Sequence, residues 1–262
     1  MSVLLHLSDT HFGTEQPHVV SALLDLSRKV RPDIAVLSGD VTQRARSGQF
    51  LAARRFTEAL GAAVTLVVPG NHDIPLFNLA ARMVSPYANY RRAFGAQLEP
   101  QFCGDDALVL CVNTTRPWRH KDGEVSLAQI QHVAQCLRKA APRQLRVVVV
   151  HQPLLVIDDK DRDNLLHGHR MAAQTWTEAG ADLILSGHIH LPYVRSMQGR
   201  QAWVVSAGTA VSTRVRGSRP NSVNLIRHDP AQMPRSCVVE RMDFDAASGS
   251  FIAAETRRLE LD

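Results

Sequence analysis

The sequence predicts an α/β fold in which a largely parallel β-sheet packs against a second sheet. Three observations predict it. Short apolar runs alternate with amphipathic helical segments over residues 1–70, the apolar runs end in polar side chains with a glycine or proline nearby, and strand-like runs without a clear helix fill residues 200–262. Strand–helix–strand order with short connections is typical of parallel strands joined by right-handed crossovers.

Short apolar runs rich in β-branched residues predict the buried strands of the parallel sheet. Strands of this kind belong to sheets that are covered on both faces. We expect them at residues 3–7, 34–37, 64–68, 107–112, 145–150 and 183–185.

The segments between these strands show helical periodicity. In the first of them Val19, Leu23 and Val30 lie near one face, and Pro17 suits a first helical turn. Pro86 is expected to interrupt a later helix. Helices are predicted at residues 17–30, 47–60, 78–94, from Ser126 to 140, and 169–179, with a polar loop at 157–165.

The remaining strand-like runs differ from the earlier ones because no clear helical segment separates them. They are expected to form an antiparallel second sheet, or the edge of one, packed on the first. They lie at residues 203–206, 223–226, 237–244 and 251–256. The sequence contains no linker that would argue for two domains, so residues 1–262 are predicted to form a single domain, with residues 200–262 mainly strands of the second sheet.

The overall composition is ordinary for a soluble globular protein, with 45% apolar and 21% charged residues. The net charge is +5, and the basic excess is nearly all arginine. Arginine suits bidentate phosphate contacts, which favours an anionic substrate, although codon usage in a GC-rich genome explains the excess equally well. Peripheral attachment to an anionic membrane is left open.

The four cysteines show no CxxC pairing, which indicates free thiols in a reducing compartment. The first residues lack the basic and apolar regions of a signal peptide, and no apolar run approaches the ~20 residues of a membrane span. We therefore expect a cytoplasmic protein. The sequence does not fix the oligomeric state and is compatible with a homodimer.

Polar side chains follow five of the predicted buried strands. In a parallel sheet, the carboxyl ends of the strands lie along one edge, which is where ligands bind in open α/β folds. The i, i+2 spacing of a D-x-H or H-x-H pair sends both side chains to the same face of an extended segment. The segments are Asp9-x-His11, Gly39-Asp40, Gly70-Asn71-His72-Asp73, His151 and Gly187-His188-x-His190.

These carboxylate, imidazole and carboxamide groups predict a metal centre. Mixed oxygen and nitrogen ligands without cysteine suit Mn, Fe or Zn. Seven ligands are too many for one tetrahedral ion but fit two divalent ions ~3.5–4 Å apart that share a carboxylate. Asp40 is the natural bridge because it lies in the middle of the set and alone on its strand end.

The series D-x-H, GD, GNHD, H, GHxH resembles the calcineurin-like metallophosphoesterase superfamily over residues 9–190. The resemblance implies a four-layer α-β-β-α sandwich, in which two mixed β-sheets pack face to face and are flanked by helices. It implies one metal held by Asp9, His11, Asp40 and His190, and a second held by Asp40, Asn71, His151 and His188.

Within that superfamily the chain looks most like the bacterial class III cyclic-nucleotide phosphodiesterases, on its SDTHFG, SGDVTQ and PGNHD segments. This implies a hydrolase for a small-molecule phosphodiester, with a 3′,5′-cyclic nucleotide favoured. Two divalent ions lower the pKa of a shared water and supply a hydroxide near neutral pH. His72 is the proton donor that the resemblance implies, acting as general acid on the leaving alkoxide.

One position departs from the phosphoprotein phosphatase branch of the superfamily, where GDxxDRG supplies an aspartate that orients the catalytic histidine. Gln43 occupies that position here. Another group must therefore orient His72, and Asp73 is the nearest candidate by sequence. Capping of the turn, or of the helix that follows, is an equally good role for Asp73.

Four arginines are candidates for substrate binding. Arg44 and Arg46 follow Asp40 closely and are candidates for phosphate contacts, with a solvated loop as the alternative. Arg116 follows a strand in a segment that could clamp a base. Arg214 belongs to a loop rich in Ser, Thr and Arg that either lines the pocket or is a basic hairpin.

The sequence is also compatible with three other functions to different degrees. A pyrophosphatase acting on a nucleotide-linked lipid, such as a UDP-diacylglucosamine, resembles GNRD at the third motif, so His72 argues against it, whereas an exposed apolar patch beside the site would favour it. A DNA-directed nuclease suits the basic charge, but no aromatic-and-basic module supports binding to nucleic acid. A non-enzyme scaffold is disfavoured because every ligand position is filled.

Overall fold

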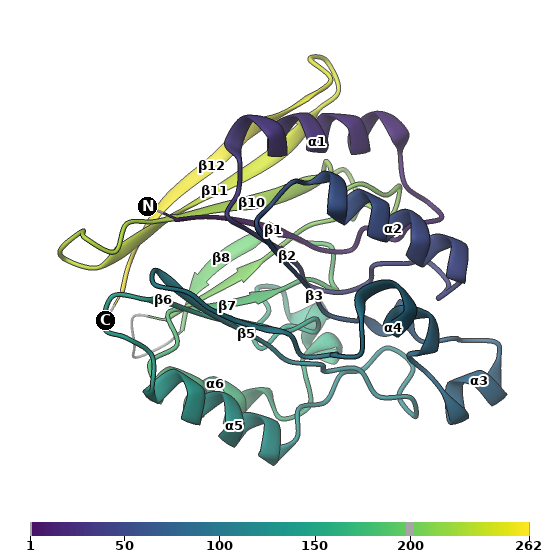
Figure 1. Cartoon of the computed structure of the whole chain (residues 1–262), viewed down its shortest axis with the longest axis horizontal. Helices are drawn as coiled ribbons and strands as arrows, with labels where there is room; N and C mark the ends of the chain where they lie inside the picture. Colours follow the sequence, from purple (N-terminus) through teal and green to yellow (C-terminus); the bar gives the residue numbers. More distant parts are fainter. Residues whose placement is uncertain (1, 198–201, 262) are drawn as a thin grey trace.

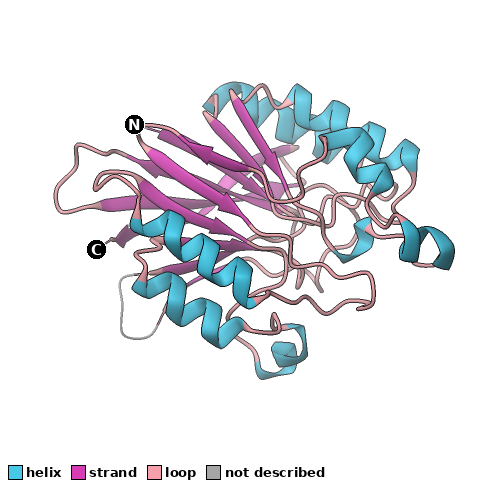
Figure 2. Cartoon of the chain, turned by 60° about the horizontal axis from the view of Figure 1, so that its bottom comes forward, coloured by secondary structure: helices cyan, strands magenta, loops and turns pink. Residues whose placement is uncertain are grey.

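The structure is a computed structural model that describes residues 2–197 and 202–261. It contains two six-stranded mixed sheets that pack face to face, with helices on their outer surfaces (Figures 1 and 2). This confirms the predicted four-layer α-β-β-α architecture.

The first sheet has the strand order β12-β11-β10-β1-β2-β3. Its three parallel strands are β1 (Ser2–Leu7), β2 (Ile34–Leu37) and β3 (Val64–Val67), paired with Leu4 opposite Ile34 and Ile34 opposite Val64. The other edge of β1 pairs antiparallel with β10 (Ser222–His228), which is followed by β11 (Ser236–Asp245) and β12 (Ser250–Glu260).

The second sheet has the strand order β4-β5-β6-β7-β9-β8. The four central strands are parallel, and the short strands at each end are antiparallel to their neighbours. The strands are β4 (Gln101–Cys103), β5 (Ala107–Cys111), β6 (Leu145–Val149), β7 (Leu183–Ser186), β8 (Tyr193–Ser196) and β9 (Trp203–Ser206).

Helices cover the outside of each sheet. In Figure 1, α1 (Pro17–Val30) and α2 (Ser47–Ala59) cover the first sheet, and α5 (Leu127–Arg138) and α6 (His169–Glu178) cover the second. Pro86 lies between α3 (Leu79–Val84) and α4 (Ala88–Phe94), so the predicted interruption of helix 78–94 is confirmed. The predicted loop at 157–165 contains the short 3₁₀ helix η2 (Asp159–Asn164).

The core has three parts because each parallel strand is apolar on both faces. Leu4, Val36, Val147 and Leu185 belong to the cluster between the two sheets. Leu5, Leu23 and Phe50 belong to the cluster beneath α1 and α2, and Leu110, Ile130 and Trp176 to the cluster beneath α5 and α6. Each sheet therefore buries one face against the other sheet and one face against helices.

The placement of the last strands differs from the sequence prediction. Residues 222–260 do not form the second sheet, but extend the first sheet beyond β1, while β9 joins the second sheet beside β7. The edge of β1 opposite β2 has main-chain groups that need partners, and β10 supplies them in antiparallel register. The short strands β4 and β8 were not predicted.

No helix in residues 2–197 and 202–261 has the length and apolar character needed to span a membrane.

The short helix η1 (Asn71–Asp73) follows β3 and carries part of the third motif. The carboxyl ends of β1, β2 and β3 lie opposite those of β6 and β7. These five strand ends are followed by the polar segments.

Candidate metal centre

The five polar segments meet at the interface between the two sheets. The segments after β1, β2 and β3 come from the first sheet, and those after β6 and β7 come from the second. The expectation that one sheet edge carries all of them is therefore wrong, although the ligands do converge. Because the two sheets face each other, both sets of strand ends lie close together. The site is therefore bounded by one sheet on each side.

The first group of ligands is formed by Asp9, His11, Asp40 and His190, whose ligand atoms all lie within 4.8 Å of one another. His190 Nε2 lies 3.3 Å from both Asp9 Oδ1 and His11 Nε2. His11 Nε2 lies 3.7 Å from Asp40 Oδ2. Two ligands about 2.1 Å from one tetrahedral ion are about 3.4 Å apart, so this spacing suits a shared cation.

The second group is formed by Asp40, His151 and His188, again within 4.8 Å. His151 Nε2 lies 3.3 Å from Asp40 Oδ1 and 3.2 Å from the amide oxygen of Asn71. The rings of His151 and His188 meet edge to face, with centroids 5.1 Å apart. Asp40 therefore turns one oxygen toward each group, as a bridging carboxylate does.

The chemistry of these atoms fits bound cations. Asp9 Oδ1 is buried and has no hydrogen-bond partner among the described residues. Burial lowers the pKa of both His11 and His188 to about 3, so these rings are neutral and keep a lone pair for a metal. Burial opposes the charge on Asp9, but His190 holds the pKa of this carboxyl below its usual range. Oxygen anions and neutral imidazoles are the donor set of Mn, Fe and Zn sites.

The backbone at the ligands is held in an unusual conformation. Asp9, His11, Asp40, His188 and His190 all have φ between 42° and 71°, in the left-handed region that side chains other than glycine rarely adopt. Each such residue costs about 1–2 kcal/mol. Concentration of this strain at the candidate ligands indicates that the surrounding structure fixes their directions.

Hydrogen bonds from the main chain and from Thr209 orient the ligand side chains. His151 Nδ1 lies 2.8 Å from the carbonyl oxygen of Ser38, so Nδ1 carries the proton and Nε2 faces the site. His190 Nδ1 contacts the carbonyl oxygen of Arg214 and lies 2.9 Å from Thr209 Oγ1. Such partners fix the tautomer and the ring of a metal ligand.

Main-chain amides orient the two carboxylates. The amide of His188 donates to Asp9 Oδ2 at 3.0 Å, and the amide of His72 donates to Asp40 Oδ1 at 2.8 Å. Gly70 is needed for this approach, since a Cβ at that position would lie 2.1 Å from the amide nitrogen of Asp40 and 2.2 Å from its Oδ1. The glycine before the third motif is thus explained by close packing against the bridging carboxylate.

His72 lies beside the ligands but is held by different contacts. Its Nδ1 lies 3.0 Å from the carbonyl oxygen of Gln43, and its ring meets that of His11 edge to face at 4.8 Å. Its Nε2 lies 3.5 Å from a guanidinium nitrogen of Arg214, which also donates to the side chain of Gln43 at 3.1 Å. The group that orients His72 is therefore the main chain of Gln43.

Asp73 has the capping role rather than contact with the His72 ring. Its buried carboxylate accepts hydrogen bonds from the amides of Val41, Thr42 and Gly70 at 2.8–3.0 Å, and from the Thr42 hydroxyl at 2.8 Å. Burial and the charge of Asp40 raise the pKa of Asp73 to about 6. Asp73 ties the loop after β2 to the turn after β3, so it supports the site without facing it.

The structure separates the four candidate arginines. The side chain of Arg214 contacts His72, whereas Arg44 and Arg46 are exposed on the loop after β2. Arg116 donates to the carbonyl oxygens of Asn113 and Thr115 and to Gln129, which ties its own loop to the start of α5. These contacts give Arg116 a structural role.

Sequence reasoning missed Thr209 and the carbonyls of Ser38, Gln43 and Arg214. A main-chain carbonyl has no signal in a sequence, because every residue has one. Thr209 could have been noticed only as a polar residue in the same loop as Arg214.

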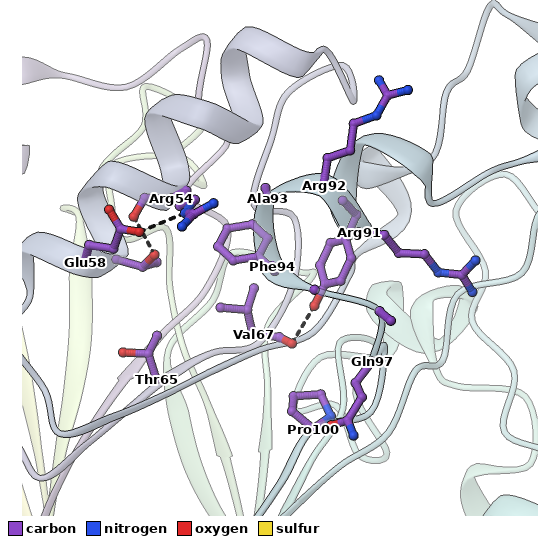
Figure 3. A pocket seen from close by; sticks show the side chains of 14 residues that line it. Arg54, Glu58, Thr65, Val67, Arg91, Arg92, Ala93, Phe94, Gln97 and Pro100 are labelled. Carbon is purple, nitrogen blue, oxygen red and sulfur yellow. Dashed lines mark hydrogen bonds and ion pairs between the residues drawn. The ribbon is translucent and has the colours of Figure 1, made fainter.

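A cavity of about 680 Å³ lies elsewhere, between α2, α4 and the edge strand β3 (Figure 3). The Tyr90 hydroxyl donates to the carbonyl oxygen of Val67 inside it, and Arg91 and Arg92 point away from its apolar side chains. None of the candidate ligands is among the residues that line it. The cavity is therefore separate from the metal centre.

Comparison with known proteins supports the same chemistry. A family model described as calcineurin-like phosphoesterase matches residues 2–192. The chain is 26% identical over 229 residues to a glycerophosphodiester phosphodiesterase, GpdQ, of Enterobacter lignolyticus, covering 80% of this chain and 77% of the relative. It is 25% identical over 219 residues to a cAMP/cGMP dual specificity phosphodiesterase of Mycobacterium tuberculosis, covering 78% and 67%.

Among solved structures, a dimetal phosphatase from Danio rerio matches with a TM-score of 0.66 and 13% identity, covering 100% of this chain and 99% of that one. At this identity the likeness shows the fold. It agrees with the two facing sheets that bring the ligand segments together.

Proposed function

Because the chain belongs to the calcineurin-like phosphoesterase family, we propose that it is a phosphodiesterase that hydrolyses a small nucleotide phosphodiester, with 3′,5′-cyclic nucleotides as the favoured class. The observation that carries this proposal is the shared carboxylate of Asp40 between two ligand groups, with His72 and Arg214 beside them. The relative named for cAMP and cGMP supports the choice of substrate.

Seven side chains would hold two divalent ions, which we propose to be Mn, Fe or Zn. Asp9, His11, Asp40 and His190 would hold the first, and Asp40, Asn71, His151 and His188 the second. When bound, two such ions supply a hydroxide nucleophile near neutral pH and neutralise charge on the phosphoryl group.

His72 would deliver the proton that the leaving oxygen needs from Nε2 of its imidazolium form, in which both ring nitrogens carry a proton. Since Nδ1 donates to the carbonyl oxygen of Gln43, Nε2 is the nitrogen that faces the site. Proton transfer of this kind is worth about 10²–10⁴-fold in rate. Arg214 would bind a phosphoryl oxygen, because its guanidinium lies at His72 and its carbonyl holds the ring of His190.

A second cavity, which begins at the residues that follow His190 in the chain, would offer space for the organic part of the substrate. It measures about 760 Å³ and is lined by Leu191 and Pro192 and by side chains of both charges, namely Asp158, Asp159, Lys160, Arg216 and Arg219. Ligand pockets commonly measure about 300–1,000 Å³. Lys160 pairs with Asp158 at 2.7 Å and Arg216 pairs with Asp161 at 3.0 Å, so much of the charge on its walls is compensated. Arg44 and Arg46 remain proposed phosphate contacts on the loop after β2.

Two other substrate classes are favoured by specific observations. A glycerophosphodiester is favoured by the relative named for that activity. A nucleotide-linked lipid is favoured by the exposed apolar side chains of α3, which begins a few residues after His72. The cytoplasmic location and the homodimer remain predictions from the sequence.

One assay panel with Mn²⁺ tests the proposal. It compares 3′,5′-cyclic nucleotides, 2′,3′-cyclic nucleotides, glycerophosphodiesters, a UDP-linked lipid, single-stranded DNA and bis(p-nitrophenyl) phosphate. We expect the highest kcat/KM for a 3′,5′-cyclic nucleotide. Activity on the artificial diester without activity on cyclic nucleotides would reject the substrate and keep the phosphodiesterase, whereas inactivity on every diester would reject both.

A further inference from the structure

Helix α3 exposes its apolar residues and buries its arginine. Leu79, Met83 and Val84 are 69%, 75% and 85% exposed, whereas Arg82 is only 8% exposed and is the one buried side chain of the helix. A surface helix normally turns its apolar stripe toward the core. The orientation of α3 is the reverse of that arrangement.

Three hydrogen bonds from Arg82 fix this orientation. Its guanidinium donates to the carbonyl oxygens of Pro75 at 3.1 Å, Pro117 at 2.6 Å and Arg119 at 2.5 Å. These bonds attach α3 to two loops, so the outward direction of its apolar side chains is built into the fold. Trp118 lies between two of the acceptor residues and is therefore beside α3, with 71% of its surface exposed.

Phe77 extends the same apolar region toward the metal centre. It is 79% exposed, and the guanidinium carbon of Arg44 lies 5.2 Å from the centre of its ring. Arg44 follows Gln43, whose carbonyl holds His72. We call Phe77, Leu79, Met83, Val84 and Trp118 the α3 surface. Monomeric soluble proteins rarely expose large apolar residues in such a group.

The α3 surface and the segments next to it carry exposed cations. Residues 42–49, 74–98 and 114–121 contain arginine and lysine but no aspartate or glutamate, although Arg82 is buried and Arg119 pairs with Glu124 at 2.8 Å. The exposed cations of these segments include Arg44, Arg46 and Lys121. Exposed apolar and aromatic side chains beside cations are the composition of surfaces that lie in the head-group region of a membrane. Cations there are attracted to the head groups of anionic lipids.

We propose that the α3 surface docks on an anionic phospholipid membrane. Figure 1 shows α3 at the margin of the molecule, outside both sheets, so the surface protrudes. A protruding surface of this kind suits insertion among lipid head groups. A second copy of the chain is disfavoured, because a two-fold interface would bring the basic segments of both copies together.

Docking in this way would bring the metal centre to the membrane surface, since Phe77 lies between α3 and the loop that holds His72. Docking of this kind is independent of which phosphodiester the protein hydrolyses.

Vesicle co-sedimentation tests the proposal. We expect the full-length protein to bind phosphatidylcholine–phosphatidylglycerol vesicles at least about tenfold more tightly than vesicles of phosphatidylcholine alone. The fluorescence of Trp118 should shift to shorter wavelength on binding, while Trp176 is already buried and Trp203 is half-buried in β9. Full-length protein that stays in the supernatant with the mixed vesicles would overturn the proposal.

Two variants assign the binding to this surface. The triple variant Leu79→Gln, Met83→Gln, Val84→Gln should lose at least about tenfold in affinity for the mixed vesicles, since three apolar side chains no longer leave water on binding. Trp118→Gln tests the same surface independently of α3. Met171→Gln is the control, because Met171 is 53% exposed on α6, in the opposite helical layer.

The Met171→Gln control and a measurement of the oligomeric state test the proposal further. An equal loss in Met171→Gln, or no loss in both α3-surface variants, would overturn the proposal. So would a dimer in light scattering that the triple variant converts to a monomer. Hydrolysis of bis(p-nitrophenyl) phosphate in solution should be unchanged in all of these variants, which separates a failure of docking from a failure of the proposed function.

Discussion

The Nδ1 atom of His72 lies 3.0 Å from the main-chain carbonyl oxygen of Gln43. A carbonyl only accepts, so this contact places the proton on Nδ1 and turns Nε2 toward Arg214. In the phosphoprotein phosphatase branch, the second aspartate of the GDxxDRG motif orients the corresponding histidine. In this chain the main-chain carbonyl of Gln43 makes the orienting contact. Gln43 also occupies the position at which those phosphatases have the aspartate.

Removal of the shared carboxylate should abolish metal binding and activity together. In Asp40→Asn, both ligand groups lose their common anion, so we expect loss of both ions and a fall in kcat/KM of more than about 100-fold. Metal content by mass spectrometry and diester hydrolysis measure the two effects. Asp25→Asn is a control, since its side chain is 65% exposed on α1, away from both ligand groups. A variant that keeps two ions would contradict the bridging role.

Loss of His72 should slow turnover without removing metal. In His72→Ala we expect kcat to fall by about 10²–10⁴-fold, because the leaving oxygen loses its proton donor. The fall should be smaller for bis(p-nitrophenyl) phosphate, whose leaving group needs no proton, than for an alkyl diester. Equal losses on both substrates would argue against a general acid.

Arg214 and Arg116 should behave differently although both were candidates for substrate binding. In Arg214→Ala we expect kcat/KM to fall by about tenfold to 100-fold, as for loss of a charged hydrogen bond. In Arg116→Ala the guanidinium contacts to Asn113, Thr115 and Gln129 are lost, so stability should fall while KM stays the same. Steady-state kinetics and urea unfolding distinguish the two, and a raised KM in Arg116→Ala alone would reverse the assignment.

Asp73 should matter for stability more than for proton transfer. Asp73→Asn presents an amide group to four donors, which we expect to lower the free energy of unfolding by about 1–3 kcal/mol. Urea unfolding of the metal-free protein measures this. A variant with full stability but a shifted pH–rate profile would instead show that Asp73 acts on His72.

Metal binding should release protons. Burial alone would lower the pKa of His151, but Asp40 at 3.3 Å raises it to about 9, so this ring is protonated in the metal-free protein at pH 7. A metal must displace that proton, so affinity should rise with pH until about 9 and fall as the pH drops below it. Calorimetry in two buffers of different ionisation enthalpy measures the release, and identical heats in both would contradict it.

Much of the fold and of the site follows from the sequence alone. The buried strands, the break at Pro86 and the polar side chains after β1, β2, β3, β6 and β7 are local patterns, which short stretches of chain determine through their own periodicity. The seven candidate ligands follow in the same way, because a motif at a strand end can be recognised without knowing which strand lies beside it.

The tertiary structure decided what depends on contacts between distant segments. It placed β10–β12 beside β1 and divided the ligand segments between two sheets, since edge pairing between remote strands leaves no pattern in a short stretch. It gave His72 a backbone partner, gave Asp73 four donors, and turned α3 outward through Arg82. The sequence therefore determined which side chains are present at each strand end, and only packing decided which of them meet, because a hydrogen bond to a main-chain group depends on position and not on residue type.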